Sequence, residues 1–95
     1  MDLNRCAPNE HLEARLPKTL QNDAYRAMIE RLKAARLKAG ITQQVLADAL
    51  GLPQSYVAKV ERFERRLDVI ELIDLALEIG TDPVKLVREA TKARR

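Results

Sequence analysis

Apolar residues recur at spacings of three and four along much of this chain, and that period is typical of amphipathic helices. Over residues 24–39 the period is carried by Met28, Ile29, Leu32, Ala35 and Ala39. Gly40 follows directly, and glycine commonly ends a helix because it tolerates a positive φ. Asp23 precedes the stretch and is predicted to be its N-cap residue. The pattern therefore predicts a first helix over residues 24–39.

Four further helices are predicted by the same period and by the residues that begin and end helices. Gly51 and Gly80 are placed to end two of them, and Pro53 suits the first turn of another because its φ is already helical. The predicted helices cover residues 43–50 after the N-cap Thr42, residues 53–62, residues 69–79 after the N-cap Asp68, and a stretch that begins at Asp82 and Pro83 and runs into the basic tail. Five short helices with tight connections predict an all-α fold, a compact five-helix bundle.

The chain has 95 residues, a length that fits a single domain. Hydrophobic residues make up 46% of it and aromatic residues 3%, so the core is expected to be aliphatic. Residues 1–22 contain Pro8 and Pro17 and no sustained apolar period. We therefore predict an N-terminal arm over residues 1–22, a helical domain over residues 23–91 and a basic tail over residues 92–95.

Charge is distributed unevenly along the chain, whose net charge is +3. Residues 24–66 hold nine Lys or Arg and four acidic residues, whereas residues 67–84 hold five acidic residues and no basic one. Residues 85–95 are again basic, with five Lys or Arg and one acidic residue. Two basic segments around an acidic one are typical of a protein with one face toward nucleic acid and another toward a different partner.

The chain offers little material for a catalytic or metal site. Cys6 is the single cysteine and His11 the single histidine, so neither a disulfide within the chain nor a cysteine-based zinc site can form. No acid–base pair stands near a nucleophile and no phosphate-binding loop is present, so we expect no enzyme, metal or cofactor. No stretch approaches the roughly 20 apolar residues that span a bilayer, and the N-terminus does not resemble a signal peptide. We expect a soluble, intracellular protein with no membrane partner.

The most informative stretch runs from Thr42 to Glu61, where two predicted helices are joined by a short turn. Two helices that cross steeply need a small residue at their crossing point and a residue that tolerates positive φ in the turn. Ala47 supplies the first and Gly51 the second. The positions that must point inward are all apolar: Leu46, Leu50, Leu52, Val57 and Val60. This combination predicts a helix-turn-helix whose recognition helix begins near Pro53.

Together with its flanks, this stretch resembles the phage repressor and Cro class of helix-turn-helix proteins, the Xre family. The resemblance covers residues 24–80 and rests on Gly40 to Gln43, Leu46 and Ala47, Leu50 and Gly51, Val57 to Glu61, and Glu64 to Leu67. It implies a five-helix bundle of the lambda-repressor-like DNA-binding type, which agrees with the helix count. It also implies sequence-specific binding of double-stranded DNA, with the recognition helix in the major groove.

The resemblance assigns the polar residues of the recognition helix and its flanks to DNA. It implies that bases are contacted by Gln54, Ser55, Lys59 and Tyr56, and phosphates by Gln43, Arg62, Arg65 and Arg66. Glutamine can pair with adenine, and lysine can donate to guanine. Tyr56 is expected either to touch the DNA backbone or to rest on a thymine methyl group. Gln43 is also expected to brace Gln54.

The resemblance further implies a partly buried ion pair between Arg36 and Glu61, with a structural role. Three residues depart from the family pattern. Ala58 replaces a common Ser, Pro53 replaces a polar N-cap, and Phe63 stands where Gly is common. We therefore expect the turn after the recognition helix to differ from the family's, and the Phe63 ring to wedge into the core or against a partner.

Residues 69–79 carry a broader apolar stripe than one side of a small bundle requires. We expect part of this stripe to complete the core. The remainder, together with Val84, Leu86 and Val87, is expected to form the contact of a homodimer. A palindromic site requires two recognition helices about one DNA turn, or 34 Å, apart, and a homodimer supplies them.

These features predict a transcriptional regulator. The leading interpretation is a repressor that binds a palindromic operator. We expect it in the cytoplasm of a bacterium, encoded by the bacterium or by a phage and associated with the nucleoid when bound to DNA. Two alternatives are open. One is an antitoxin that represses its own operon and masks a toxin protein with residues 1–22. The other is an adaptor whose domain no longer contacts DNA.

Overall fold

Five α-helices follow one another in the computed structural model, which describes residues 22–94. They are α2 (Asp23–Lys38), α3 (Gln43–Leu50), α4 (Gln54–Glu61), α5 (Val69–Ile79) and α6 (Pro83–Arg94). Residues 22–94 contain no strand, and the predicted all-α five-helix bundle is confirmed. Of the predicted arm, only Asn22 is described; Cys6, His11 and Arg95 lie outside the described residues.

α2 begins one residue earlier than predicted and has a different N-cap. The side-chain oxygen of Asn22 accepts a hydrogen bond from the backbone N–H of Tyr25 at 3.1 Å. Asp23, the predicted cap, is instead the first helical residue. Its carboxylate still stabilises the helix because it lies near the positive end of the helix dipole. Asn and Asp are equally good N-caps, so the sequence alone could not separate these two neighbours.

Pro53 is the N-cap of α4 and does not belong to its first turn, contrary to the prediction. Its ψ of 149° is extended, and it makes no side-chain cap hydrogen bond. Thr42 and Asp68, by contrast, cap α3 and α5 through their side chains, as predicted. An eight-residue helix such as α4 is not stable in isolation. Without a side-chain cap, it depends on its packing against the other helices.

Two left-handed residues make the turns before and after α4. Gly51 has a φ of 69°, and across its turn the N–H of Leu52 donates to the carbonyl oxygen of Ala47 at 2.9 Å. Phe63 has a φ of 62°, which costs a non-glycine residue about 1–2 kcal/mol. Phe63 thus takes a left-handed conformation that Gly adopts more readily, and the expected difference from the family's turn stays a prediction.

The side chain of Phe63 offsets part of that strain through its contacts. Its ring is half-buried against a cluster formed by Tyr25, Ile29 and Val60. The guanidinium of Arg26 lies over the ring, 4.1 Å from its centroid, and such cation–π contacts stabilise by about 0.5–1 kcal/mol at exposed sites. The expected wedge into the core is therefore present.

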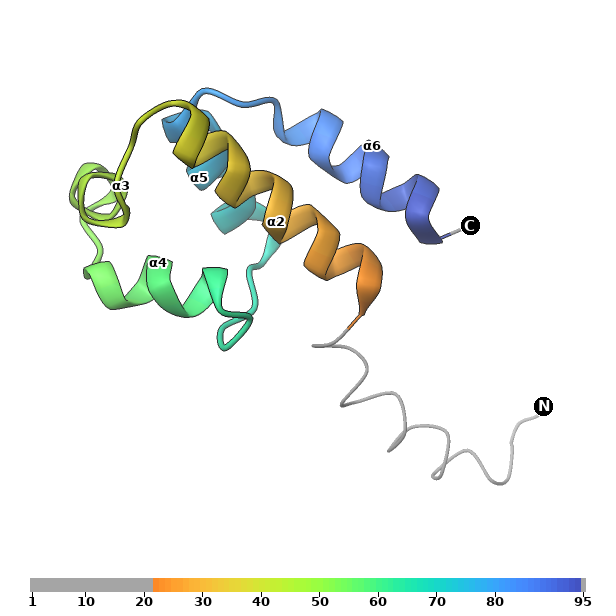
Figure 1. Cartoon of the computed structure of the whole chain (residues 1–95), viewed down its shortest axis with the longest axis horizontal. Helices are drawn as coiled ribbons and strands as arrows, with labels where there is room; N and C mark the ends of the chain where they lie inside the picture. The colour runs from red at the N-terminus through yellow and green to blue at the C-terminus, as the bar shows by residue number, and fades with distance from the viewer. Residues whose placement is uncertain (1–21, 95) are drawn as a thin grey trace.

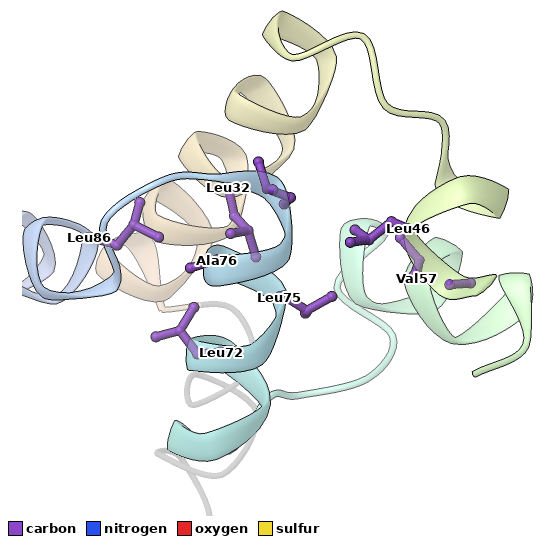
Figure 2. Packing of buried hydrophobic residues seen from close by; sticks show 9 residues of the cluster. Leu32, Leu46, Val57, Leu72, Leu75, Ala76 and Leu86 are labelled. Carbon is purple, nitrogen blue, oxygen red and sulfur yellow. The ribbon is translucent and has the colours of Figure 1, made fainter. Parts of the chain in front are cut away.

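α3 and α4 lie together at one end of the bundle, whereas α6 runs along the other side of α2 (Figure 1). Side chains from all five helices meet in the main core (Figure 2), which consists of Leu32, Leu46, Ala47, Val57, Leu72, Leu75, Ala76, Ile79 and Leu86. Ala47 and Ala76 are completely buried, and their small side chains allow neighbouring helices to approach closely. The core thereby holds α3 and α4 as a rigid unit on the bundle.

Candidate nucleic-acid interface

α3 and α4 form a helix-turn-helix with Gly51 in the turn. Leu46 on α3 and Val57 on α4 are each only 2% exposed. Leu50, at the end of α3, is half-buried against the same core. Because the inner faces of both helices are buried, only their outer faces are accessible to a ligand. The predicted crossing residue Ala47 is among the buried residues.

The outer face of α4 presents three of the four residues predicted for base contact. Gln54, Ser55 and Lys59 are exposed, and the exposed Arg62 follows as the C-cap residue. Ser55, Lys59 and Arg62 are separated by four and three residues, so they share one face of the helix. Amide, hydroxyl and ammonium groups are those that hydrogen-bond to base edges in the major groove. The face has the chemistry of a recognition helix.

Tyr56 is half-buried and does not share the face of Ser55 and Lys59; its contact with DNA stays a prediction. Its ring is half-buried against the core, and the Arg65 guanidinium covers it at 4.4 Å from the centroid. Burial and the neighbouring charge of Glu71 raise the pKa of the Tyr56 hydroxyl. Tyr56 stands one position after Ser55, and a step of one residue turns a side chain by about 100° around a helix. Within the fold, its side chain links α4 to α5 through Glu71.

Arg65 is paired within the fold although its side chain is 41% exposed, and its contact with phosphate stays a prediction. Its guanidinium donates to the Glu71 carboxylate at 2.9 and 3.2 Å and lies over Tyr56. Glu71 in turn accepts from the backbone N–H of Asp68 and completes the capping box of α5. Both hydrogen bonds lower the pKa of Glu71. Arg65 therefore connects the loop after α4 to the start of α5.

The two other predicted phosphate-binding arginines lie on the surface. Arg62 pairs with Glu64, with Nε and Oε2 3.1 Å apart and both side chains more than half exposed. The hydrogen bond to Glu64 raises the pKa of Arg62. Exposed pairs of this kind are weak and screened by salt, so Arg62 can exchange Glu64 for a phosphate. Arg66 is exposed and places its guanidinium 5.0 Å from the centroid of the Tyr25 ring.

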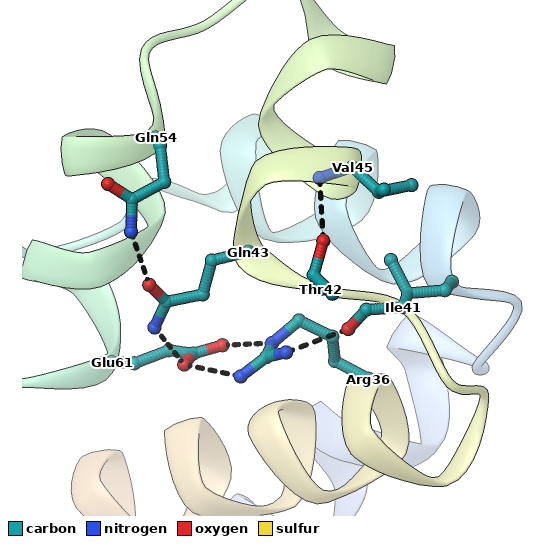
Figure 3. Close-up of polar contacts among 7 residues, drawn as sticks. All are labelled: Arg36, Ile41, Thr42, Gln43, Val45, Gln54 and Glu61. Carbon is teal, nitrogen blue, oxygen red and sulfur yellow. Dashed lines mark hydrogen bonds and ion pairs between the residues drawn. The ribbon is translucent and has the colours of Figure 1, made fainter.

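A chain of hydrogen bonds runs from the core to the outer face of α4 (Figure 3). Gln54 donates through Nε2 to Oε1 of Gln43 at 2.6 Å. Gln43 donates through its own Nε2 to Oε1 of Glu61 at 2.8 Å. The structure thus brings Gln43 against Gln54, the arrangement in which Gln43 braces the first side chain of α4.

The chain ends in an ion pair between Arg36 on α2 and Glu61 on α4. Nε of Arg36 lies 2.6 Å from Oε2 of Glu61, and Nη2 lies 2.9 Å from Oε1. The side chains are 6% and 8% exposed. Nη1 of Arg36 also donates to the carbonyl oxygen of Ile41 at 2.7 Å. Arg36 thereby ties α2, the loop before α3 and the end of α4 together.

Sequence reasoning missed two carboxylates at this interface, Glu64 and Glu71, which hold Arg62 and Arg65. Glu71 follows the cap Asp68 at the spacing of a capping box, and this signal could have placed it at the start of α5. Within residues 22–94, no group of three or more His, Cys, Asp or Glu side chains is arranged to hold a metal ion. No helix in the same part of the chain is long and apolar enough to cross a membrane.

Comparison with known proteins agrees with this geometry. A helix-turn-helix family model matches residues 32–86. A solved structure of an XRE-family like protein from Pseudomonas syringae pv. tomato is 48% identical, with a TM-score of 0.74, over 84% of this chain and 98% of that one. A propionyl-CoA carboxylase regulator from Cereibacter sphaeroides is 36% identical over 56 residues, which are 59% of this chain and 12% of that regulator.

The match spans only about an eighth of the regulator's length. The family match covers α3, α4 and α5 entirely and reaches Leu86 in the core. It includes every residue of the outer face of α4 and both members of the Arg36–Glu61 pair. The chain belongs to the Xre-type helix-turn-helix family, whose members are DNA-binding transcriptional regulators.

Proposed function

We propose that this protein is a repressor that binds a palindromic operator as a homodimer. The observation that carries the proposal is the surface of α4, where Ser55 and Lys59 share one exposed face and the exposed Gln54 at the start of the helix is held by Gln43. A glutamine amide can pair with N6 and N7 of adenine, and a lysine ammonium can donate to O6 and N7 of guanine. Arg62, which follows Lys59 on the same face, and the exposed Arg66 in the loop after α4 are the proposed contacts for the sugar-phosphate chain.

Selection from a random DNA pool at physiological salt tests this function directly. We expect enrichment of an inverted repeat whose half-sites are about one helical turn, or 34 Å, apart. The specific complex should weaken steeply as salt rises, because phosphate contacts release counterions. Enrichment of one unrepeated site would contradict the palindrome. No enrichment at all would contradict the function and favour the adaptor alternative.

An apolar patch on α5 and α6 supports the homodimer. Its exposed members are Val69, Ile70, Leu77, Val84 and Val87, each between 47% and 69% exposed. Several of these residues line a groove of about 510 Å³ together with Ile73, Pro83 and Arg88. Leu86, which was expected in this contact, is 4% exposed and belongs to the core. Contiguous exposed apolar surface is typical of protein–protein contacts.

The charges beside the patch fit a second copy of the same chain. Exposed Asp74 and Glu78 lie on α5, whereas the exposed Arg88 lies on α6 at the groove. A two-fold axis presents the same patch on both copies. Pairing of α5 with the partner's α6 brings unlike charges together around the apolar residues. The dimer then displays two copies of α4, as a palindrome requires.

Replacement of Leu77 by Glu tests this contact. Leu77 is 64% exposed, so the substitution should leave the thermal stability of the domain nearly unchanged. A charge in the apolar contact should weaken self-association by about tenfold or more, since burial of one leucine contributes about 1.5–3 kcal/mol. Analytical ultracentrifugation and light scattering of the DNA complex measure the effect.

Leu37→Glu is the matched control, because Leu37 is 58% exposed and lies on α2 outside the groove. Leu77→Glu should give a monomer and weak binding to the palindrome, whereas Leu37→Glu should behave as the original chain. Equal self-association of both variants would place the dimer contact elsewhere. A monomer-only complex of the original chain would contradict the homodimer.

The antitoxin alternative assigned toxin binding to residues 1–22, of which the structure describes only Asn22. The described residues give this second function no specific support. As such a repressor, the protein is proposed to act at the nucleoid, in the cytoplasm of a bacterium.

A further inference from the structure

The side-chain amides of Gln43 and Gln54 each have a donor end and an acceptor end, and the orientation of each amide decides which end faces DNA. We propose that Glu61 sets this orientation from within its ion pair, and that it thereby gives Gln54 a preference for adenine over guanine. The proposal rests on the DNA-binding function proposed above. It assigns Glu61 a role in specificity besides its role in the fold.

The first step is the carboxylate of Glu61, which can only accept hydrogen bonds while it is paired with a guanidinium. Arg36 donates to both of its oxygens, at 2.6 and 2.9 Å. At 8% side-chain exposure, Glu61 has little access to water that could supply other donors. Any amide that contacts Glu61 must therefore turn its NH2 group toward it.

The second step passes this orientation on to Gln43 and Gln54. Nε2 of Gln43 donates to Oε1 of Glu61 at 2.8 Å, so Oε1 of Gln43 points away from Glu61 and can only accept. Nε2 of Gln54 donates to that oxygen at 2.6 Å. Figure 3 shows the three side chains in line between α2 and the outer face of α4. The accepting character of Glu61 thus orients both amides.

The third step concerns the hydrogen-bonding groups of Gln54 that remain available to DNA. One of its two N–H bonds is used by Gln43, which leaves its carbonyl oxygen and one N–H. Adenine presents one donor, N6–H, and one acceptor, N7, in the major groove, whereas guanine presents two acceptors, O6 and N7. An oxygen beside an N–H complements adenine. If the amide were reversed, its two N–H groups would complement guanine instead.

Glu61→Gln tests the proposal because glutamine has the same shape and can donate as well as accept. With its NH2 group in the place of Oε1, Gln at position 61 keeps the hydrogen bond from Nε of Arg36, loses the one from Nη2 and can donate to Oε1 of Gln43. This allows both amides to reverse. The base pair that Gln54 contacts is first identified as the one whose preference is lost in Gln54→Ala. At that pair, the preference for adenine over guanine should fall by roughly five- to 150-fold in Glu61→Gln.

Arg36→Lys is the control for lost stability. It weakens the same ion pair, because lysine cannot form the forked contact of arginine, but it leaves the carboxylate at position 61. Its preference for adenine should persist even though its melting temperature falls. Both variants are measured well below their melting temperatures. An unchanged preference in Glu61→Gln, or an equal loss in Arg36→Lys, would overturn the proposal.

A measurement on the free protein separates this proposal from the proposed function. Nuclear Overhauser effects should connect the side-chain amide protons of Gln43 to the Hγ protons of Glu61, and not to the Hγ protons of Gln54. In Glu61→Gln the contacts to Gln54 should appear. The opposite pattern in the original chain would overturn the inference even if DNA binding is specific. The expected pattern without specific DNA binding would instead contradict the proposed function.

Discussion

Replacement of Arg36 by Ala is expected to lower the free energy of unfolding by about 3–5 kcal/mol, because it leaves the buried Glu61 carboxylate without its partner. Arg36 makes two hydrogen bonds to Glu61 and one to the Ile41 carbonyl oxygen, and only 6% of its side chain is exposed. For a domain of this size, a loss of that order lowers the melting temperature by more than about 10 °C. Calorimetry or thermal circular dichroism measures it.

The matched control is Arg31→Ala, which removes another arginine from α2. Arg31 pairs with Glu89 at 2.8 Å, but its side chain is 48% exposed, and exposed pairs contribute about 0–1 kcal/mol. The double variant Arg36→Met with Glu61→Leu should recover most of the lost stability, since a buried ion pair is often replaceable by apolar side chains. A melting temperature of Arg36→Ala equal to that of Arg31→Ala would show that the pair does not stabilise the fold.

Replacement of Gln54 and Lys59 by Ala, singly and together, is expected to have the largest effect on DNA binding. Both side chains are exposed on α4, so their removal leaves the fold intact. Each well-formed contact to a base contributes about 1–3 kcal/mol of discrimination, so each single variant should lose preference at its own base pair. The double variant should bind the selected site little better than random DNA. Fluorescence anisotropy with both DNA sequences at fixed salt measures this.

Lys85→Ala is the control for the loss of one positive charge. Lys85 is exposed on α6, which packs against α2 on the side away from α4 (Figure 1). This variant should retain the base preference of the original chain. If Lys85→Ala and Lys59→Ala lost affinity equally and neither changed the preference, binding would depend on net charge alone. That result would remove α4 as the recognition helix.

Much of the fold was predictable because its signals are local. The period of apolar residues gave the five helices, and Gly40, Gly51 and Gly80 each have the positive φ that ends a helix. Errors arose where two neighbours compete for one role. Asn22 and Asp23 are both good caps, and Pro53 is compatible with either the N-cap or the first turn, since its φ is the same in both.

The outer face of α4 was also predictable, because Ser55 and Lys59 occupy helix positions opposite Val57 and Val60, which are buried, and Gln54 is the exposed first residue of the helix. The contacts of Tyr56 and Arg65 with α5 were not predictable. A tyrosine and an arginine each carry both an apolar body and a polar end, so their type is compatible with a DNA contact and with packing. Their partners come from α5, and only the fold brings Glu71 to them.

The sequence by itself determined the helix-turn-helix and the face that it exposes, because helix period, caps and turn glycines act between residues close together in the chain. Only the tertiary structure decided how the polar side chains pair. Glu61 reaches Arg36 across 25 residues and Gln43 across 18, and Gln54 reaches Gln43 across 11. Such contacts depend on how the helices pack together, and no local pattern specifies the direction of their hydrogen bonds.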